Sequence, residues 1–231
     1  MVYEVYLLVY YLPRSFSISI AKQFEIVSLI LIRRIFKDIS KLDINDFELF
    51  IFDNLNLLYD IVGFLIMFFL IFVFRYLLIN KRYHAKTKNM EGFIFYKKAL
   101  CVILGPLLLV LSIYSFGNWI FEYYQLNNNL ISEVKDFNNI FYNEFFTALI
   151  LVDVLILVAS FRYTDRYSLI IRNTGFVVTT VLIRIAFSTT GLANIALLLS
   201  GTLFGVTILY IFSLYDKIDK GESTKESYAY L

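Results

Sequence analysis

Four charged residues lie within or at the ends of long apolar segments, where a charge is costly unless it has a partner or a task. They are Glu144, Asp153, Arg172 and Arg184. Ionisable side chains in such surroundings pair with one another or mark ion and proton sites. Two interpretations follow. The residues form ion pairs that fix the register of neighbouring helices, or they form a site for an ion, a proton or an anionic lipid.

Residues for other kinds of chemistry are few. His84 is the only histidine and Cys101 the only cysteine, so we predict no metal site and no cofactor site. The chain has no glycine-rich phosphate loop and no visible base beside a nucleophile, so we predict no catalytic residues. A membrane-embedded hydrolase would need two aspartates facing each other at one depth, and the predicted spans do not place Asp60 and Asp153 in this way.

The composition decides the class of protein. Of the 231 residues, 59% are hydrophobic and 17% are charged, against about 25% charged in soluble domains. This excludes an ordinary soluble enzyme, a disordered chain and a disulfide scaffold. The apolar segments are continuous rather than alternating, which favours helices over a membrane barrel. We therefore predict an all-α, polytopic transmembrane helix bundle whose partners include membrane lipids. The net charge of +2 indicates no direct nucleic-acid partner.

Five segments are predicted to span the membrane, because a bilayer core takes roughly 20 helical residues. Ser188 to Gly191 supplies a tight turn between the last two. The segments are 57–79, 99–121, 145–161, 167–187 and 193–212.

The basic residues lie mainly on one side of these spans. They gather in 81–98, in 162–166 and in the tail, 216–231, and the positive-inside rule places those parts in the cytoplasm. Abundant Phe, Ile, Tyr, Asn and Lys indicate an AT-rich prokaryotic genome. We therefore predict a multi-pass protein of the bacterial inner (cytoplasmic) membrane with a cytoplasmic C-terminus. Five spans would leave the N-terminus outside.

The N-terminal region, residues 1–56, carries many basic residues and is expected to differ from the transmembrane bundle, 57–215. Between Ser15 and Ser40 the polar and apolar residues separate onto two helical faces, which is typical of an interfacial amphipathic helix. A helix packed on the bundle would show the same pattern. A sixth span is a further alternative, which would place Lys22, Gln23 and Glu25 in the bilayer.

Depth along antiparallel helices predicts two ion pairs, at about 1.5 Å per residue. Glu144 and Arg184 lie near the outer end, so we pair them. Asp153 lies further in and is paired with Arg172, whose long side chain can reach toward it.

Gly201 and Gly205 form a GxxxG pattern in the last span. Small residues at this spacing let two helices approach closely. Packing within one chain and an interface between copies are both compatible with the pattern. We expect a homo-oligomer with the last span at the contact.

The segment 153–215 resembles the phosphate-starvation-inducible E (PsiE-like) family of small bacterial inner-membrane proteins. The resemblance rests on Asp153 in LVDVLILVASF and on two arginines twelve residues apart, Arg172 and Arg184, in IIRNTGFVVTTVLIRIAF. A final uncharged span and a charged tail complete it, and with the span at Ala99 it covers about 99–215.

The chain departs from the family in one turn, because 164–167 lacks the His and Pro that members often have there. Residues 1–90 look like an addition to the family's four spans. The resemblance implies an inner-membrane helical bundle with a cytoplasmic C-terminus, and it implies no established biochemical activity.

Three functions remain as expectations. The first is a non-enzymatic accessory or regulatory membrane component of a bacterial stress or defence response, including CRISPR-associated and anti-phage systems, with an unidentified protein partner. The second is a homo-oligomeric pore or ion channel with the arginines lining the path. The third is a membrane-embedded enzyme.

Overall fold

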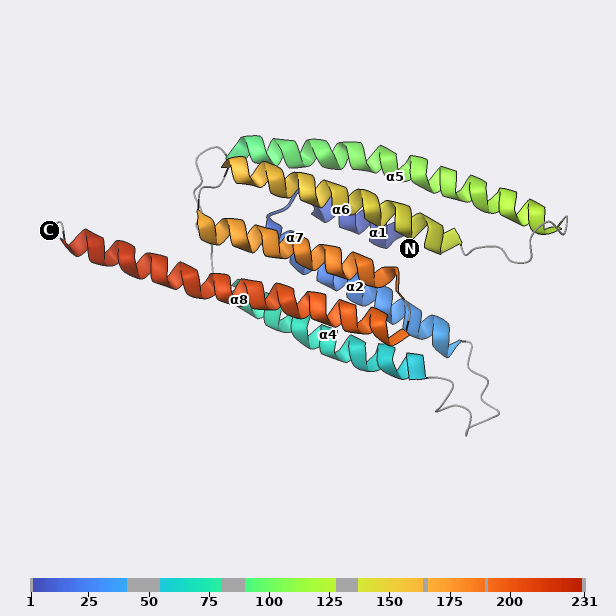
Figure 1. The fold of residues 1–231 in the computed structure, drawn as a ribbon, viewed down its shortest axis with the longest axis horizontal. Helices are drawn as coiled ribbons and strands as arrows, with labels where there is room; N and C mark the ends of the chain where they lie inside the picture. Colours follow the sequence, from blue (N-terminus) through green and yellow to red (C-terminus); the bar gives the residue numbers. More distant parts are fainter. Residues whose placement is uncertain are drawn as a thin grey trace.

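The described part of the chain is helical. A computed structural model describes residues 2–40, 55–79, 90–127, 137–163, 166–189 and 191–229. The regular structure within these ranges consists of helices (Figure 1). In chain order they are α1 (Val2–Tyr11), α2 (Phe16–Ile39), α4 (Leu55–Ile79), α5 (Met90–Asn127), α6 (Phe137–Tyr163), α7 (Tyr167–Phe187) and α8 (Gly191–Ala229).

Five of the described helices are long and apolar enough to cross a membrane. Each contains one of the five predicted spans, so the expected polytopic helix bundle is confirmed. The helix α5 continues through Pro106, which membrane helices tolerate. The apolar segments are Leu57–Ile79, Gly92–Asn118, Phe145–Tyr163, Tyr167–Phe187 and Gly191–Asp216.

The long helices lie roughly along one direction (Figure 1). The helices α5 and α6 pack together on one side of the bundle, and α4 and α8 pack together on the other. Between them lie α1, α2 and α7, with α7 in contact with both α6 and α8. The bundle therefore has two outer pairs of helices and a central layer.

The buried apolar side chains form two separate cores. The first, called here the α4–α8 core, joins α2, α4, α7 and α8 and includes Phe24, Phe74 and Phe176. The second, called the α5–α6 core, joins α1, α2, α5 and α6 and includes Phe145 and Leu149. Because α2 contributes residues to both cores, it joins the two halves of the bundle.

The helix α2 runs along the bundle rather than across its end. It begins after Ser15, whose hydroxyl accepts a hydrogen bond from the Ile18 N–H at 3.4 Å. At this end the Arg14 carbonyl meets Lys97, near the start of α5. At the other end Arg34 meets Asn194, near the start of α8. The amphipathic segment 15–40 therefore forms a helix that lies alongside several of the spans.

This position differs from the interfacial one that we expected for α2. The aromatic ring of Phe24 is fully buried and lies edge-on to Phe74, with ring centroids 5.0 Å apart. Packing of that kind contributes through burial of the ring and through the edge-to-face geometry. The apolar face of α2 is therefore satisfied by protein, as in the alternatives of a packed helix or a sixth span.

The connection between α7 and α8 is short, as predicted. The helix α7 ends at Phe187, and the N–H of the following Ser188 donates to the carbonyls of Ala186 and Ile185. The helix α8 starts at Gly191, which has a φ angle of 64°. That left-handed conformation is favourable for glycine because it has no Cβ. The turn makes α7 and α8 antiparallel neighbours, which places Arg172 and Arg184 on a helix held against α8.

Candidate functional site in the bundle interior

Asp153 lies buried between α6 and α7, where it contacts two residues of α7. Its Oδ2 atom is 2.7 Å from Nη1 of Arg184 and accepts a hydrogen bond from the Thr180 hydroxyl at 3.1 Å. Asp153 is 6% exposed and Arg184 is 4% exposed. Removing one member of such a pair leaves the other charge buried without a partner, which is strongly destabilising.

The Asp153–Arg184 attraction depends on charge more than on hydrogen-bond geometry. Nη1 and Nη2 of Arg184 are both buried and form no well-aligned hydrogen bond with the described residues. A guanidinium carries five N–H donors in a planar fork, and here the fork does not engage the carboxylate along two parallel bonds. The contact is therefore a close ion pair, and it is not the bidentate arrangement that makes arginine pairs strongest.

Lys97 also belongs to the interior, which the sequence did not indicate. Only 3% of Lys97 is exposed, whereas the adjacent Lys98 is exposed. The Lys97 ammonium donates to the Arg14 carbonyl at 2.9 Å. It also lies 4.2 Å from the ring centroid of Phe16 and 5.2 Å from that of Phe93. Consecutive helical residues point about 100° apart, so one lysine faces the interior while the next faces outward.

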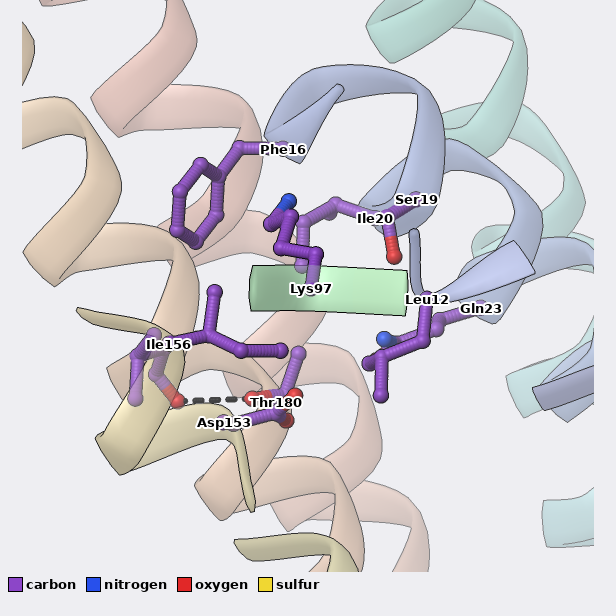
Figure 2. Close-up of a pocket in the computed structure, with 10 residues that line it drawn as sticks. Leu12, Phe16, Ser19, Ile20, Gln23, Lys97, Asp153, Ile156 and Thr180 are labelled. Atoms are coloured by element: carbon purple, nitrogen blue, oxygen red, sulfur yellow. Dashed lines mark hydrogen bonds between the residues drawn. The ribbon is translucent and has the colours of Figure 1, made fainter. Parts of the chain in front are cut away.

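A small cavity lies between Lys97 and Asp153 (Figure 2). Its volume of about 20 Å³ is room for a single water molecule, which needs at least ~10–15 Å³ by the same measure. Ser19 and Gln23 of α2 line it together with Thr180 of α7. A water in this cavity would have the two to four polar neighbours that a buried water requires.

We call these residues the polar centre. It consists of Ser19 and Gln23 from α2, Lys97 from α5, Asp153 from α6, and Thr180 and Arg184 from α7. It draws on helices of both the α4–α8 core and the α5–α6 core. The centre brings two basic side chains, Lys97 and Arg184, around one carboxylate, Asp153.

The ion pair differs from the pairing that we predicted for Asp153. The depth argument paired Asp153 with Arg172, whereas in the structure its described partner is Arg184. The reason is the direction of side chains on a helix, which lean toward the N-terminus. Arg184 lies one turn after Thr180 and leans back to the level of Asp153. Arg172 leans away from Asp153, toward the start of α7.

Arg172 and Glu144, the other two predicted site residues, fall in different places. The Arg172 guanidinium lies 4.6 Å from the ring centroid of Phe212 in α8 and donates to Oδ1 of Asn173 at 3.0 and 3.3 Å. The side chain of Glu144 lies outside the described residues, so the predicted Glu144–Arg184 pair stays a prediction. The structure thus brings Asp153 and Arg184 together and places Arg172 against another helix.

A second polar network joins four parts of the bundle at the turn between α7 and α8. Arg34 of α2 donates to both carboxylate oxygens of Asp60 in α4, at 2.5 and 2.6 Å. It also donates to the side-chain oxygen of Asn194 in α8 at 2.8 Å. Asn194 in turn donates to the carbonyls of Ala186 and Thr189. Asp60 was noted from the sequence, but no spacing rule links it to an arginine 26 residues earlier.

Three further charged residues of α2, Lys22, Glu25 and Arg33, also have partners within the chain. Glu25 lies 2.8 Å from Lys22 and 2.9 Å from Arg75 of α4, and Arg33 pairs with Glu4 of α1. A span at α2 would place the polar residues Lys22, Gln23 and Glu25 in the bilayer, which is costly unless they have partners. Gln23 is buried in the polar centre and the other two are paired, so the protein supplies what the bilayer lacks.

Gly201 and Gly205 face other helices of the same chain. A Cβ on Gly205 would lie 2.9 Å from Cζ of Phe24 and 3.0 Å from Cγ2 of Thr179. A Cβ on Gly201 would lie 3.2 Å from Leu182 and Ile183. The GxxxG face is therefore occupied by α7 and α2, in agreement with packing within one chain. We expected a contact between copies at this face, but α7 and α2 of the same chain already cover it.

Comparison with family models, with curated proteins and with solved structures gives no match. The resemblance to the PsiE-like family therefore stays a prediction. Within the described ranges, no three His, Cys, Asp or Glu residues come close enough to hold a metal ion together. The candidate site rests on the geometry of the polar centre.

Proposed function

We propose that the chain is a non-enzymatic integral membrane protein that acts as an accessory or regulatory component, and that the polar centre is the part that switches. The position of Lys97 carries this proposal. Its ammonium is bound to the Arg14 carbonyl, and the Asp153 carboxylate lines the same cavity. Lys97 and Asp153 line one cavity of one-water size, so a change of the Lys97 rotamer would bring its ammonium toward the carboxylate as a second partner.

An exchange of Lys97 between these partners would couple two parts of the bundle. Arg14 lies between α1 and α2, one residue before the Ser15 N-cap of α2, so release of its carbonyl loosens the attachment of α1 and α2 to α5. Asp153 at present attracts Arg184, so capture of its carboxylate by Lys97 weakens the hold of α6 on α7. Two arrangements with different internal pairs are the kind of bistable element on which regulation is built.

Two further observations support regulation over the alternatives. Asp60 is bound by Arg34 and Asp153 by Arg184, so these two aspartates are not arranged as the facing pair of a hydrolase. Arg184 is buried within one chain, whereas Arg172 lies against Phe212. The two arginines therefore have separate surroundings, and a pore lined by both would need a different arrangement.

The cellular setting belongs to the same proposal. The resemblance to the PsiE-like family favours a stress or defence response in the bacterial inner membrane, with CRISPR-associated and anti-phage systems among the candidates. The basic connections and tail favour a cytoplasmic C-terminus. In this setting the chain would act on a protein partner and would carry out no reaction itself.

Co-expression tests the accessory role. The chain is produced with the product of a neighbouring gene, and the activity of that protein is measured with wild type, Lys97→Met and Lys98→Met. We expect the wild type and Lys98→Met to change this activity, and Lys97→Met to lose the effect while it remains inserted in the membrane. An equal effect of all three, or no effect of the wild type, would contradict the proposal.

Ion flux separates this role from a pore. The purified protein is reconstituted into liposomes that enclose an ion-sensitive dye, and leakage is followed under an imposed gradient. We expect liposomes with protein to leak no faster than protein-free liposomes. A sustained flux that Arg184→Gln or Arg172→Gln removes would favour the pore instead.

A further inference from the structure

The helices α7 and α8 approach closely at Gly201 and Gly205 of α8 and at Gly175 of α7. A Cβ on Gly175 would lie 2.7 Å from Cγ1 of Ile208, so the two helices are in tight contact there. Beyond this point a groove of about 180 Å³ opens between them. It lies at the opposite end of α7 from the Ser188 turn, near the predicted cytoplasmic end of the spans.

The groove combines an apolar lining with one cation. Ile171 and Phe212 line it together with Ile208 and Ile211. Arg172 lines the same groove, where its guanidinium lies 4.6 Å from the Phe212 ring centroid. Its Nε and Nη2 donate to Oδ1 of Asn173, and the stacking on the ring holds the plane of the guanidinium in place, so that the groove has a fixed positive charge on its wall.

Two tyrosines give the groove the character of a membrane boundary. Tyr167 is the first residue of α7 and Tyr215 precedes Asp216, where the apolar segment of α8 ends. Both line the groove, and they are 70% and 49% exposed. Tyrosines are enriched at the level of the lipid headgroups, so the groove lies where a headgroup meets its acyl chains.

We propose that this groove binds an anionic phospholipid. The phosphate would meet the Arg172 guanidinium, and the first part of an acyl chain would lie along Ile208 and Ile211. The charge of the guanidinium attracts a phosphate, and hydrogen bonds between two charged groups are stronger than those between neutral ones. Basic pockets between helices on the cytoplasmic side are typical sites for anionic headgroups. The apolar lining favours a lipid over a free phosphate, because a free phosphate has no apolar group that could cover this lining.

The test compares two lipids and two matched variants. Wild type, Arg172→Gln and Arg162→Gln are placed in nanodiscs of phosphatidylglycerol or of phosphatidylcholine, and the thermal unfolding midpoint is measured. Arg162 is exposed and lies outside the groove, and its replacement changes the charge equally. We expect phosphatidylglycerol to raise the midpoint of the wild type and of Arg162→Gln, but not that of Arg172→Gln.

Several results would overturn the proposal. Equal midpoints of the wild type in both lipids would do so, and so would equal losses in the two variants, which would indicate diffuse attraction by surface charge. Inorganic phosphate added to phosphatidylcholine nanodiscs should give no increase, and an increase equal to that from phosphatidylglycerol would identify a free phosphate site. If Arg172→Gln does not fold, mass spectrometry of the intact wild-type protein can instead identify which lipid stays bound to it. We expect retained phosphatidylglycerol, and retention of both lipids alike would refute the site.

Discussion

Asp153 and Arg184 stabilise the protein as a pair, so the loss of one should cost more than the replacement of both. Each is buried, and each has the other as its described charged partner. We predict that Asp153→Leu and Arg184→Met each destabilise the protein by about 3–5 kcal/mol, the usual cost of leaving a buried charge alone. We expect the double variant to fold about as well as the wild type, because an apolar pair of similar size replaces a buried ion pair with little loss.

The yield of folded protein and the thermal midpoint in a mild detergent measure this prediction. Arg162→Met is the control for loss of an arginine at an exposed position. Additive losses in the double variant would show that the two residues act separately. That outcome would favour the two pairs that depth alone suggested, Glu144 with Arg184 and Asp153 with Arg172.

At this scale the sequence showed which charges matter but not how they meet. Asp153 and Arg184 stand out because they interrupt apolar segments. Their pairing depends on the lean of side chains and on the rotation of α7, neither of which a depth calculation contains. Lys97 was missed because it directly precedes an apolar run, which is also where a basic residue at the membrane boundary is expected. Its burial depends on the Arg14 carbonyl, 83 residues away.

Among the helices, α8 is held against α7 and α2 by its glycine face. We predict that Gly205→Ile destabilises the single chain by about 1–3 kcal/mol or more, the cost of overpacking, because the new side chain meets Phe24 and Thr179. Gly117→Ile in α5 is the matched control, since a Cβ there would have no atom within 4 Å. The thermal midpoint of each purified variant measures the difference.

Size measurement of the same samples separates the two roles of the glycine face. A Gly205→Ile protein that stays as stable as the wild type but changes from an oligomer to a monomer would show that the face lies between copies. We expect any oligomer of the wild type to persist in Gly205→Ile for as long as the protein remains folded.

The pattern in α2 established an amphipathic helix and left its position open. Polar and apolar faces look alike whether the apolar side meets lipid or protein. The deciding contacts come from distant parts of the chain, namely Phe74, Asp60 and Asn194. In contrast, the five long spans were readable because each is long and apolar by itself. Local composition therefore predicted the elements, and only long-range contacts placed α2 among them.

For the whole molecule, the position of α2 changes the expected topology. Arg14 and Ser40 flank a helix that extends along the spans. We predict that α2 crosses the membrane as a sixth span, which would put the segment before it on the same side as the C-terminus. Arg14 would then lie on the cytoplasmic side, whereas Arg33, Arg34 and Lys37 would lie near the outer end of α2.

Cysteine labelling in intact cells tests this topology in a Cys101→Ser background. We expect an impermeant thiol reagent to react with Ser40→Cys and Ser188→Cys, and to leave Arg14→Cys and Arg162→Cys unlabelled. All four native residues are exposed, so differences in labelling report the side of the membrane. Labelling of Arg14→Cys and Ser40→Cys to the same extent would return α2 to the membrane surface.

The two halves of the bundle meet at a centre that is polar and contains a small cavity, whereas each half has its own apolar core. An interface of this kind can take two arrangements at little cost if the charged groups exchange partners. Lys97 is the group with two partners at hand. The central proposal is therefore that Lys97 sets the position of α2 relative to α6.

Distance measurement by pulsed electron resonance tests that proposal most directly. Spin labels are placed at Leu29 of α2 and Val158 of α6, which are 47% and 59% exposed, in a Cys101→Ser background in nanodiscs. We expect two distances in the wild type and in Lys98→Met, and a single distance in Lys97→Met, which keeps the chain length of lysine but loses its charge. One identical distance distribution in all three proteins would contradict a switch at the polar centre.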